Sequence, residues 1–307
     1  MTDRETVGFI GVGIMGKPMV LNLLEAGFAV VVHSRSAGPV DEVVAEGAKR
    51  GESAADVAGQ VDVVISMVPD TPDVEAVLLN GPDPVIEGVR AGQLVIDMST
   101  ISPVATKRIA AAFAAKAVAF LDAPVSGGEK GAIDGALSIM VGGREEDFAR
   151  AKPIFEVLGK SVVLVGPSGA GQVTKACNQL VVAANIEAVA EALVLAAKAG
   201  VDPAKVRKAL LGGFAGSKIL EVHGQRMLAG TFDPGFRIRL HRKDARIIEE
   251  TAKELDVPTP AFERVVAQLQ RLIDEDGGEF DHSALVKLLE QDAGIEVARA
   301  VGVDAGA

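Results

Sequence analysis

The sequence of 307 residues contains no tryptophan, no tyrosine, one cysteine and four histidines. The single cysteine, Cys177, excludes an intrachain disulfide and a cysteine-rich metal site, and we predict that no metal ion is bound. Phenylalanine, with 11 copies, must supply all of the large aromatic side chains in a core that is otherwise aliphatic. A chain rich in alanine, valine, leucine and glycine suits parallel strands that are buried on both faces beneath helices.

Acidic residues outnumber basic ones, 42 to 31, and give a formal net charge of −11. Binding a polyanion over a broad surface needs clustered lysine and arginine, so we expect no nucleic-acid partner. The sequence shows no N-terminal targeting segment and no uninterrupted apolar run close to the ~20 residues of a membrane span. We therefore expect no membrane partner and a cytoplasmic enzyme.

Apolar runs alternate with helical patterns in the first half of the chain. The runs lie at 7–10, 29–33, 61–67, 94–98, 117–121, 138–141 and 161–165. This alternation predicts βαβ units and a mainly parallel, doubly wound sheet.

The pattern changes after the glycine-rich stretch 166–171. Residues 172–199 contain no glycine or proline and predict one long helix, and further helices are expected near 203–211, 242–255, 260–274 and 283–291. A chain of this length is near the upper limit for a single core. The sequence thus predicts an α/β fold with two domains, 1–165 and 166–307, the second of them all-helical.

Three glycines, Gly11, Gly13 and Gly16, follow the first strand and open a helix. The first permits a tight turn, the second lets the backbone approach a pyrophosphate, and the third lets helix and strand pack closely. The phosphates would lie on the free N–H groups of the helix N-terminus. We predict a dinucleotide site here, with Ile14 and Met15 among the contacts.

The end of the second strand indicates which dinucleotide is bound. Enzymes that use NAD place an acidic residue there to hold the adenosine 2′-hydroxyl. This chain has His33-Ser34-Arg35-Ser36 instead, and Ser34 and Arg35 can bind a 2′-phosphate. We predict NADP(H) in preference to NAD(H), with NAD still possible. Arg35 could alternatively stack on the adenine.

Lys175 and Asn178 are three residues apart near the start of the long predicted helix, and Asn185 lies on about the same stripe. The first half of this helix is otherwise apolar, so the lysine is expected to be buried. Burial lowers the pKa of a lysine and makes it a proton donor near neutral pH. The alternative acids are His223, His241 and His282, for which structural roles are expected.

Two glycine-containing loops can hold a small ligand. Ser126-Gly127-Gly128 follows a predicted strand and offers a hydroxyl and unhindered N–H groups to a carboxylate, although the same residues also suit an ordinary turn. The loop 212–217, which ends in Ser217, has the same two interpretations.

Together these segments resemble the β-hydroxyacid dehydrogenase family over residues 6–291. The resemblance rests on GFIGVGIMGKPM at 8–19, Met67-Val68-Pro69, Ile96-Asp97-Met98-Ser99-Thr100, DAPVSGGEKGAIDGALSIMVGG at 122–143, the segment 171–178, and His241-Arg242-Lys243-Asp244.

The resemblance implies a Rossmann-type NAD(P)-binding domain and a helical substrate and oligomerisation domain, joined by a long bridging helix. Lys175 and Asn178 match the family's catalytic lysine and asparagine. Substrate binding falls on Ser126, Gly127 and Gly128, with Ser217 as a further candidate. The cofactor contacts that the family implies are Val68, Pro69, Asp73, Thr100 and Lys243. A homo-oligomer, dimer or tetramer, is also expected.

Within the family, the segments 212–217, 234–241 and 281–285 look most like members that reduce tartronate semialdehyde. Phe214 and Ser34 depart from that pattern. The expected reaction is hydride transfer from NAD(P)H to this small carboxylate-aldehyde substrate, giving D-glycerate, with Lys175 as general acid. A relative acting on 3-hydroxyisobutyrate or succinic semialdehyde is one alternative, and a non-catalytic dinucleotide-binding module is another.

Overall fold

The computed structural model describes residues 4–302, and contacts divide the chain into two compact units, Met1–Lys175 and Ala176–Ala307. This division lies ten residues after the expected one between 165 and 166. Helix α9 (Ala170–Lys198) begins within the first unit because the Asp122 carboxylate accepts backbone hydrogen bonds from Gly169 (2.7 Å) and Gln172 (3.0 Å). The domain limits 1–165 and 166–307 therefore stay a prediction.

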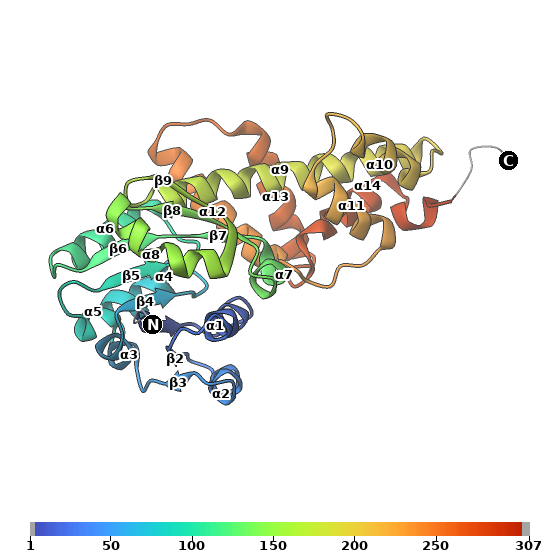
Figure 1. The fold of residues 1–307 in the computed structure, drawn as a ribbon. Coiled ribbons are helices and arrows are strands. Elements are labelled where there is room, and N and C mark those ends of the chain that lie inside the picture. The colour runs from blue at the N-terminus through green and yellow to red at the C-terminus, as the bar shows by residue number, and fades with distance from the viewer. Residues whose placement is uncertain (1–3, 303–307) are drawn as a thin grey trace. The chain divides into compact units, whose positions relative to one another are not determined.

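A nine-stranded sheet forms the centre of the first unit (Figure 1). Its strands are β1 (Val7–Ile10), β2 (Val30–His33), β3 (Lys49–Arg50), β4 (Val63–Ser66), β5 (Leu94–Asp97), β6 (Ala119–Asp122), β7 (Val125–Ser126), β8 (Leu137–Gly142) and β9 (Gly159–Gly166). Six of them are parallel in the order β3-β2-β1-β4-β5-β6. Because the chain order reverses beside β1, the carboxyl ends of β1 and β4 are where such sheets bind ligands.

The remaining strands complete one side of the sheet in mixed directions. β8 runs antiparallel to β6 and β7, and β9 runs parallel to β8. The predicted parallel, doubly wound sheet is thus confirmed for the six strands that create the cofactor-binding edge. The reversal at β8 was not expected, because an apolar run carries no information about strand direction.

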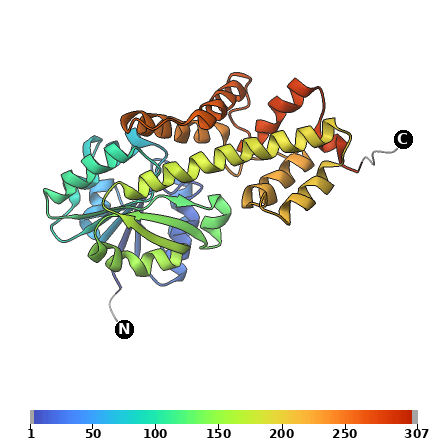
Figure 2. The ribbon, with the colours of Figure 1, turned by 90° about the horizontal axis from the view of Figure 1, so that it is seen from above.

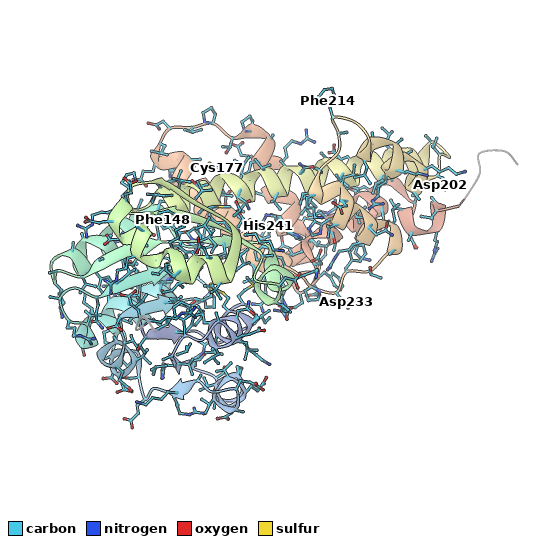
Figure 3. All side chains as sticks on the ribbon, viewed as in Figure 1. Phe148, Cys177, Asp202, Phe214, Asp233 and His241 are labelled. Atoms are coloured by element: carbon cyan, nitrogen blue, oxygen red, sulfur yellow. The ribbon has the colours of Figure 1, made fainter. Side chains whose placement is uncertain are left out.

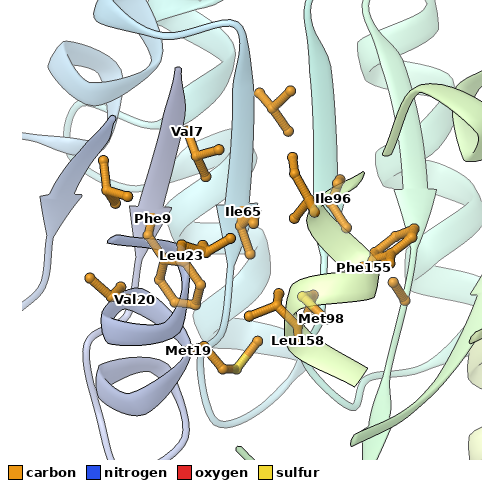
Figure 4. Close-up of a cluster of buried hydrophobic side chains, with 14 of the residues drawn as sticks. Val7, Phe9, Met19, Val20, Leu23, Ile65, Ile96, Met98, Phe155 and Leu158 are labelled. Atoms are coloured by element: carbon orange, nitrogen blue, oxygen red, sulfur yellow. The ribbon is translucent and has the colours of Figure 1, made fainter. Parts of the chain in front are cut away.

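Helices cover both faces of this sheet. Side chains alternate along each strand, so successive residues pack against opposite faces. Val7 and Phe9 of β1 pack with α1 (Gly16–Glu25) and α8 (Glu145–Leu158) in one core, which Figure 4 shows. Ile10 belongs to the core on the opposite face. The other helices of this unit are α2 (Ala37–Ala45), α3 (Ala54–Gln60), α4 (Thr71–Glu75), the π-helix η1 (Ala76–Asn80), α5 (Val85–Gly88), α6 (Pro103–Ala114) and α7 (Gly128–Ile133).

The second unit is all-helical in its described part, as predicted. It contains most of α9, which Figure 2 shows as one unbroken helix, followed by α10 (Pro203–Leu211), α11 (Lys218–Ala229), α12 (Ile238–Glu254), α13 (Pro260–Asp274), η2 (His282–Leu285), α14 (Val286–Ala293) and η3 (Val297–Ala300). The sequence did not predict α11. Its interior glycine, Gly224, weakens the helical pattern, while the Ser217 hydroxyl caps its first turn by accepting from Leu220 N–H at 3.0 Å.

Helix α9 supplies the centre of the core of the second unit, where Ala183, Ile186, Ala190 and Leu193 are fully buried. By length and composition alone, α9 could cross a membrane, which corrects our expectation that no segment would meet that criterion. One side of the helix is buried in this core, whereas Val181 and Leu195 are exposed. The large aromatic side chains that are fully buried across the described chain are all phenylalanines, namely Phe9, Phe113, Phe155 and Phe262.

Candidate active site

The glycine turn between β1 and α1 has the geometry that a phosphate site requires. Gly11 has a φ of +100°, and a Cβ there would lie 2.2 Å from the Met67 carbonyl oxygen. A Cβ at Gly16 would lie 2.0 Å from the Gly11 carbonyl oxygen. In contrast, a Cβ at Gly13 would meet no atom of the described chain within 4 Å. The protein's own packing therefore requires Gly11 and Gly16, whereas Gly13 leaves the approach to the helix N-terminus open.

The N-terminus of α1 is also free of a side-chain cap. The N-cap residue, Met15, makes no side-chain capping hydrogen bond in the described structure, and the first turn contains no acidic residue. Ile14 is 56% exposed and Met15 is half-buried. The backbone N–H groups at this end and the positive end of the helix dipole can thus receive a phosphate.

A cavity of about 180 Å³ lies at the carboxyl end of β2, lined by Ser34, Arg35 and residues of the neighbouring strand β3. Arg50 of β3, which pairs with Asp41, lines it together with Glu52, which follows the strand. Arg50 lies here because β3 runs parallel to β2, with Arg50 opposite Val32. The sequence analysis did not select Arg50, since a two-residue exposed strand has no apolar pattern to reveal it.

Hydrogen bonds fix the loops at the carboxyl ends of β4 and β5. The Ser66 hydroxyl donates to Asp97 Oδ1 at 2.8 Å, and the Ser99 hydroxyl accepts from Val68 N–H at 3.0 Å. These bonds hold Val68 and the loop that carries Thr100. Of the remaining residues predicted here, Pro69 is exposed, and Asp73 lies half-buried in the first turn of α4.

Asp97 is a fully buried carboxylate beneath this edge of the sheet. Burial raises its pKa to about 6, although hydrogen bonds from Ser99 and Ser66 partly oppose the increase. Its Oδ2 atom has no hydrogen-bond partner in the described part of the chain. Asp97 therefore acts as a structural anchor for two loops, at the cost of a desolvated charge.

The first turns of α9 are anchored to the same edge. The Gln172 side chain accepts from Ile101 N–H at 3.1 Å and donates to the Ser99 carbonyl at 2.8 Å. Lys175 lies one turn further along and is buried, with 6% of its surface exposed. The predicted burial of Lys175 is confirmed, and its position is set by Asp122 and Gln172, which sequence reasoning did not single out.

The Ser126-Gly127-Gly128 segment links β7 to α7. Gly127 and Gly128 have φ values of +136° and +60°, which L-residues with side chains rarely adopt, so glycine is required at both positions. Ser126 is half-buried. The segment thus has the unhindered backbone predicted for carboxylate binding.

In the second unit, a chain of polar contacts joins Asn178 to Lys243. Asn178 donates through Nδ2 to Gln179 Oε1 at 2.8 Å, and Gln179 donates through Nε2 to Asp244 Oδ2. Lys243 Nζ lies 2.7 Å from Asp244 Oδ1. Gln179 and Asp244 are buried, with 5% and 3% of their surfaces exposed. The structure therefore connects two predicted site residues through Gln179 and Asp244, neither of which had been assigned a role.

Ser217 has structural partners of its own. Its hydroxyl caps α11 and contacts Asn185 Oδ1 at 3.3 Å. The hydroxyl therefore holds the 212–217 loop against α9, and its contact with substrate stays a prediction.

Three of the four histidines gather in one cluster. His223 and His282 lie with Asp281 so that one ligand atom from each falls within 4.8 Å of the others, and His241 contacts His282 (Figure 3 labels His241). A larger cavity of about 650 Å³ lies elsewhere in the second unit, around Phe232 and Lys287, and none of the predicted site residues lines it.

Each half of the chain matches a known family of nicotinamide-dependent dehydrogenase domains. Residues 6–166 match the NAD-binding domain of 6-phosphogluconate dehydrogenase, and residues 169–289 match the NAD-binding domain of NADP-dependent 3-hydroxyisobutyrate dehydrogenase.

Individual relatives are similar over nearly their whole length. The 2-hydroxy-3-oxopropionate reductase of Escherichia coli is 50% identical over 285 residues, which cover 92% of this chain and 97% of the relative. The structure of Mycobacterium tuberculosis 3-hydroxyisobutyrate dehydrogenase with L-serine has a TM-score of 0.85 and 30% identity, covering 93% of this chain and 99% of that one. The structure of Psf3 in complex with NADP⁺ has a TM-score of 0.83 and 25% identity, and the match covers 92% of this chain and 100% of that one.

Proposed function

The chain belongs to the β-hydroxyacid dehydrogenase family of NAD(P)-dependent oxidoreductases, and we propose that it reduces 2-hydroxy-3-oxopropionate (tartronate semialdehyde) to D-glycerate. The observation that carries this proposal is the buried Lys175, held by its helix at the carboxyl edge of a dinucleotide-binding sheet. The 50% identity to a 2-hydroxy-3-oxopropionate reductase supports the choice of substrate.

We propose NADP(H) as the preferred cofactor. The open approach at Gly13 fits a pyrophosphate, and the cavity at Ser34 and Arg35 fits a 2′-phosphate. Arg50 brings a second guanidinium to that cavity, which favours a phosphate despite the nearby Glu52. The further contacts proposed for the cofactor are Gly11, Ile14, Met15, Gly16, Val68, Pro69, Asp73, Thr100 and Lys243. When bound, NADPH supplies the hydride that reduces the aldehyde carbon.

The chain's own residues bind the substrate and move one proton. The backbone N–H groups of Gly127 and Gly128, with the Ser126 hydroxyl, hold the substrate carboxylate, and Ser217 binds its hydroxyl. Lys175 donates a proton to the oxygen that becomes the alcohol, and Asn178 hydrogen-bonds the substrate or orients the lysine. General acid catalysis of this kind contributes roughly 10²–10⁴ to the rate.

NADPH oxidation measured with a panel of small aldehydes tests the substrate. We expect the highest kcat/KM with tartronate semialdehyde, and lower values with the semialdehydes of methylmalonate and succinate. A higher value with methylmalonate semialdehyde would instead assign the 3-hydroxyisobutyrate reaction. If no aldehyde were reduced, the enzymatic proposal would fail and the non-catalytic alternative would replace it.

A lysine substitution tests the proton donor. Lys175→Ala should lower kcat by a factor of about 100 or more while NADPH binding is retained, because the general acid is lost. Lys198→Ala is the matched control, since Lys198 lies in the last turn of the same helix and donates to the Ala293 carbonyl at 2.8 Å. Near-normal kcat in Lys175→Ala would contradict the assignment.

The remaining proposals concern location and partners. We propose that the enzyme acts in the cytoplasm on a free small-molecule substrate, with neither a nucleic acid nor a membrane as partner. The net charge of −11 supports the exclusion of nucleic acid.

A further inference from the structure

The carboxyl ends of β2 and β3 lie side by side at the edge of the sheet to which we assign the adenosine ribose. The two strands are parallel, with Val32 opposite Arg50. One residue further on, the Gly51 amide donates to the Val32 carbonyl at 2.9 Å. The His33 ring adds a second bond at this level, because its Nδ1 donates to the Gly51 carbonyl at 3.3 Å. The pairing of the two segments therefore continues beyond the end of β3.

The register of β2 and β3, continued by two residues, brings Ser34 level with Glu52. Both residues line the cavity of about 180 Å³ described above. In NAD-dependent enzymes with this fold, an acidic residue at the end of the second strand holds the ribose 2′-hydroxyl. Ser34 stands at that strand end in this chain. The carboxylate that is missing there is thus present in the same cavity, where it comes from the segment after the neighbouring strand.

The backbone that carries Glu52 is held in place from both sides. A Cβ at Gly51 would collide with the Val57 side chain of α3, so the close approach of the two segments requires glycine. On the other side, the Glu52 amide donates to Asp56 Oδ2 at 2.9 Å, and the Ser53 hydroxyl caps α3 by accepting from the Asp56 amide at 3.1 Å. The Glu52 side chain therefore extends from a fixed point of the backbone.

Two charged groups of this cavity are available to a ligand. Arg50 pairs with Asp41. In contrast, neither the Arg35 guanidinium nor the Glu52 carboxylate forms an ion pair or a side-chain hydrogen bond with the residues that the structure describes. A 2′-phosphate can accept hydrogen bonds from the guanidinium, whereas a 2′-hydroxyl can donate one to the carboxylate. The cavity thus offers a separate partner to each form of the ribose.

We propose that Glu52 is a specificity-determining residue, whose carboxylate accepts a hydrogen bond from the 2′-hydroxyl of NAD(H) and repels the 2′-phosphate of NADP(H). Arg35 acts in the opposite sense. The inference rests on the cofactor site proposed above and refines it, because the preference for NADP(H) becomes the difference between two opposing groups. The protein accordingly binds both cofactors, with a modest preference for NADP(H).

The exposure of Glu52 limits the size of each effect. Its side chain is in contact with water, which weakens the repulsion between the carboxylate and a phosphate. Two unit charges about 4 Å apart in water change an equilibrium constant roughly fivefold, and a phosphate carries between one and two charges. A hydrogen bond from the hydroxyl to the carboxylate contributes a factor of similar size. The two factors act on different cofactors, so they multiply in the ratio of the two affinities.

Calorimetric titration of the full-length protein with NAD⁺ and NADP⁺ tests the proposal, because these ligands differ only in the 2′-phosphate. Glu52→Gln removes the charge and keeps an acceptor, whereas Glu52→Ala removes both. We expect both variants to bind NADP⁺ about five- to tenfold more tightly than the wild type. NAD⁺ should bind about threefold more weakly to Glu52→Gln and about tenfold more weakly to Glu52→Ala.

Glu46→Gln is the matched control, since it removes the same charge just after α2 from a residue that does not line the cavity. We expect it to change either dissociation constant by less than about twofold, because salt screens distant exposed charges. An equal effect of Glu46→Gln and Glu52→Gln would overturn the proposal, as would a shift of both cofactors in the same direction in Glu52→Gln.

The binding measurement separates this inference from the function proposed above. It needs no aldehyde and no turnover, so unchanged dissociation constants in the two Glu52 variants would overturn the role of Glu52 alone. A wild-type protein that bound neither NAD⁺ nor NADP⁺ would instead remove the proposed cofactor site, and this inference with it. The variants are expected to fold, because the amide of residue 52 can still donate to Asp56.

Discussion

Two arginines from neighbouring strand ends, Arg35 and Arg50, line the cavity that we assign to the adenosine 2′-phosphate. They differ in their existing partners, because Arg50 already pairs with Asp41. A phosphate must compete with Asp41 for Arg50, whereas no acidic partner of Arg35 is found in the described chain. Arg35 should therefore contribute more than Arg50 to the discrimination between NADP(H) and NAD(H).

Substitution of each arginine gives a graded prediction. Arg35→Ala should raise KM for NADPH by about ten- to a hundredfold, the equivalent of a charged hydrogen bond, and leave KM for NADH nearly unchanged. Arg50→Ala should have a smaller effect in the same direction. Arg108→Ala, which removes an exposed ion pair with Glu75, is the control. If Arg35→Ala raised KM equally for both cofactors, Arg35 would be stacking on the adenine instead.

Asp97 predicts a pH-dependent stability. Its pKa rises from 3.8 to about 6 on folding, so the stability linked to its proton is complete below pH 3.8 and is lost as the pH rises through about 6. Asp97→Asn has no such titration, so its stability relative to the wild type should rise by about 3 kcal/mol as the pH increases through that range. Denaturant unfolding from pH 4 to 8 measures this difference, with the surface variant Asp134→Asn as control. A constant difference across the range would contradict it.

The elements differ in how well the sequence specifies them. The strands β1, β4 and β5 were predicted to within two residues, because each is a short apolar run between turn-forming residues. Helix α11 was missed, since Gly224 interrupts its pattern. The histidine cluster could not be predicted either, because His223 and His282 are 59 positions apart and meet only through packing of α11 against η2.

At the level of elements, Gln172 is the contact that joins the start of α9 to the 99–101 loop. Gln172→Leu keeps the volume but leaves the buried Ile101 N–H without its acceptor, which costs about 1–3 kcal/mol. We expect the free energy of unfolding to fall by that amount. We also expect a higher KM for NADPH, because the loop carries Thr100, a proposed cofactor contact. Gln270→Leu, on the exposed face of α13, should change stability by less than about 0.5 kcal/mol. Equal stability of the two variants would contradict the anchoring role.

For the whole molecule, the exposed apolar side chains support the predicted homo-oligomer. Leu195 and Val181 on α9 are 71% and 58% exposed, and Phe214 extends from its loop into solvent (Figure 3). Such side chains are stabilised when a second copy covers them.

Light scattering after size exclusion should give a mass two or four times 31.7 kDa. Leu195→Glu should shift the distribution toward the monomer, because the new charge would have to be buried in an interface. Leu255→Glu is the matched control, at a leucine that is 61% exposed on another helix end. A wild-type monomer at micromolar concentration would exclude the oligomer.

The phenylalanine-only cores have a practical consequence for spectroscopy. None of the three cores contains an indole or a phenol, so the protein contributes almost no emission of its own when excited in the near ultraviolet. Fluorescence from a bound reduced nicotinamide would therefore be recorded against a dark background, free of energy transfer from the polypeptide. A single tryptophan introduced in place of Phe214 would then report on that loop alone.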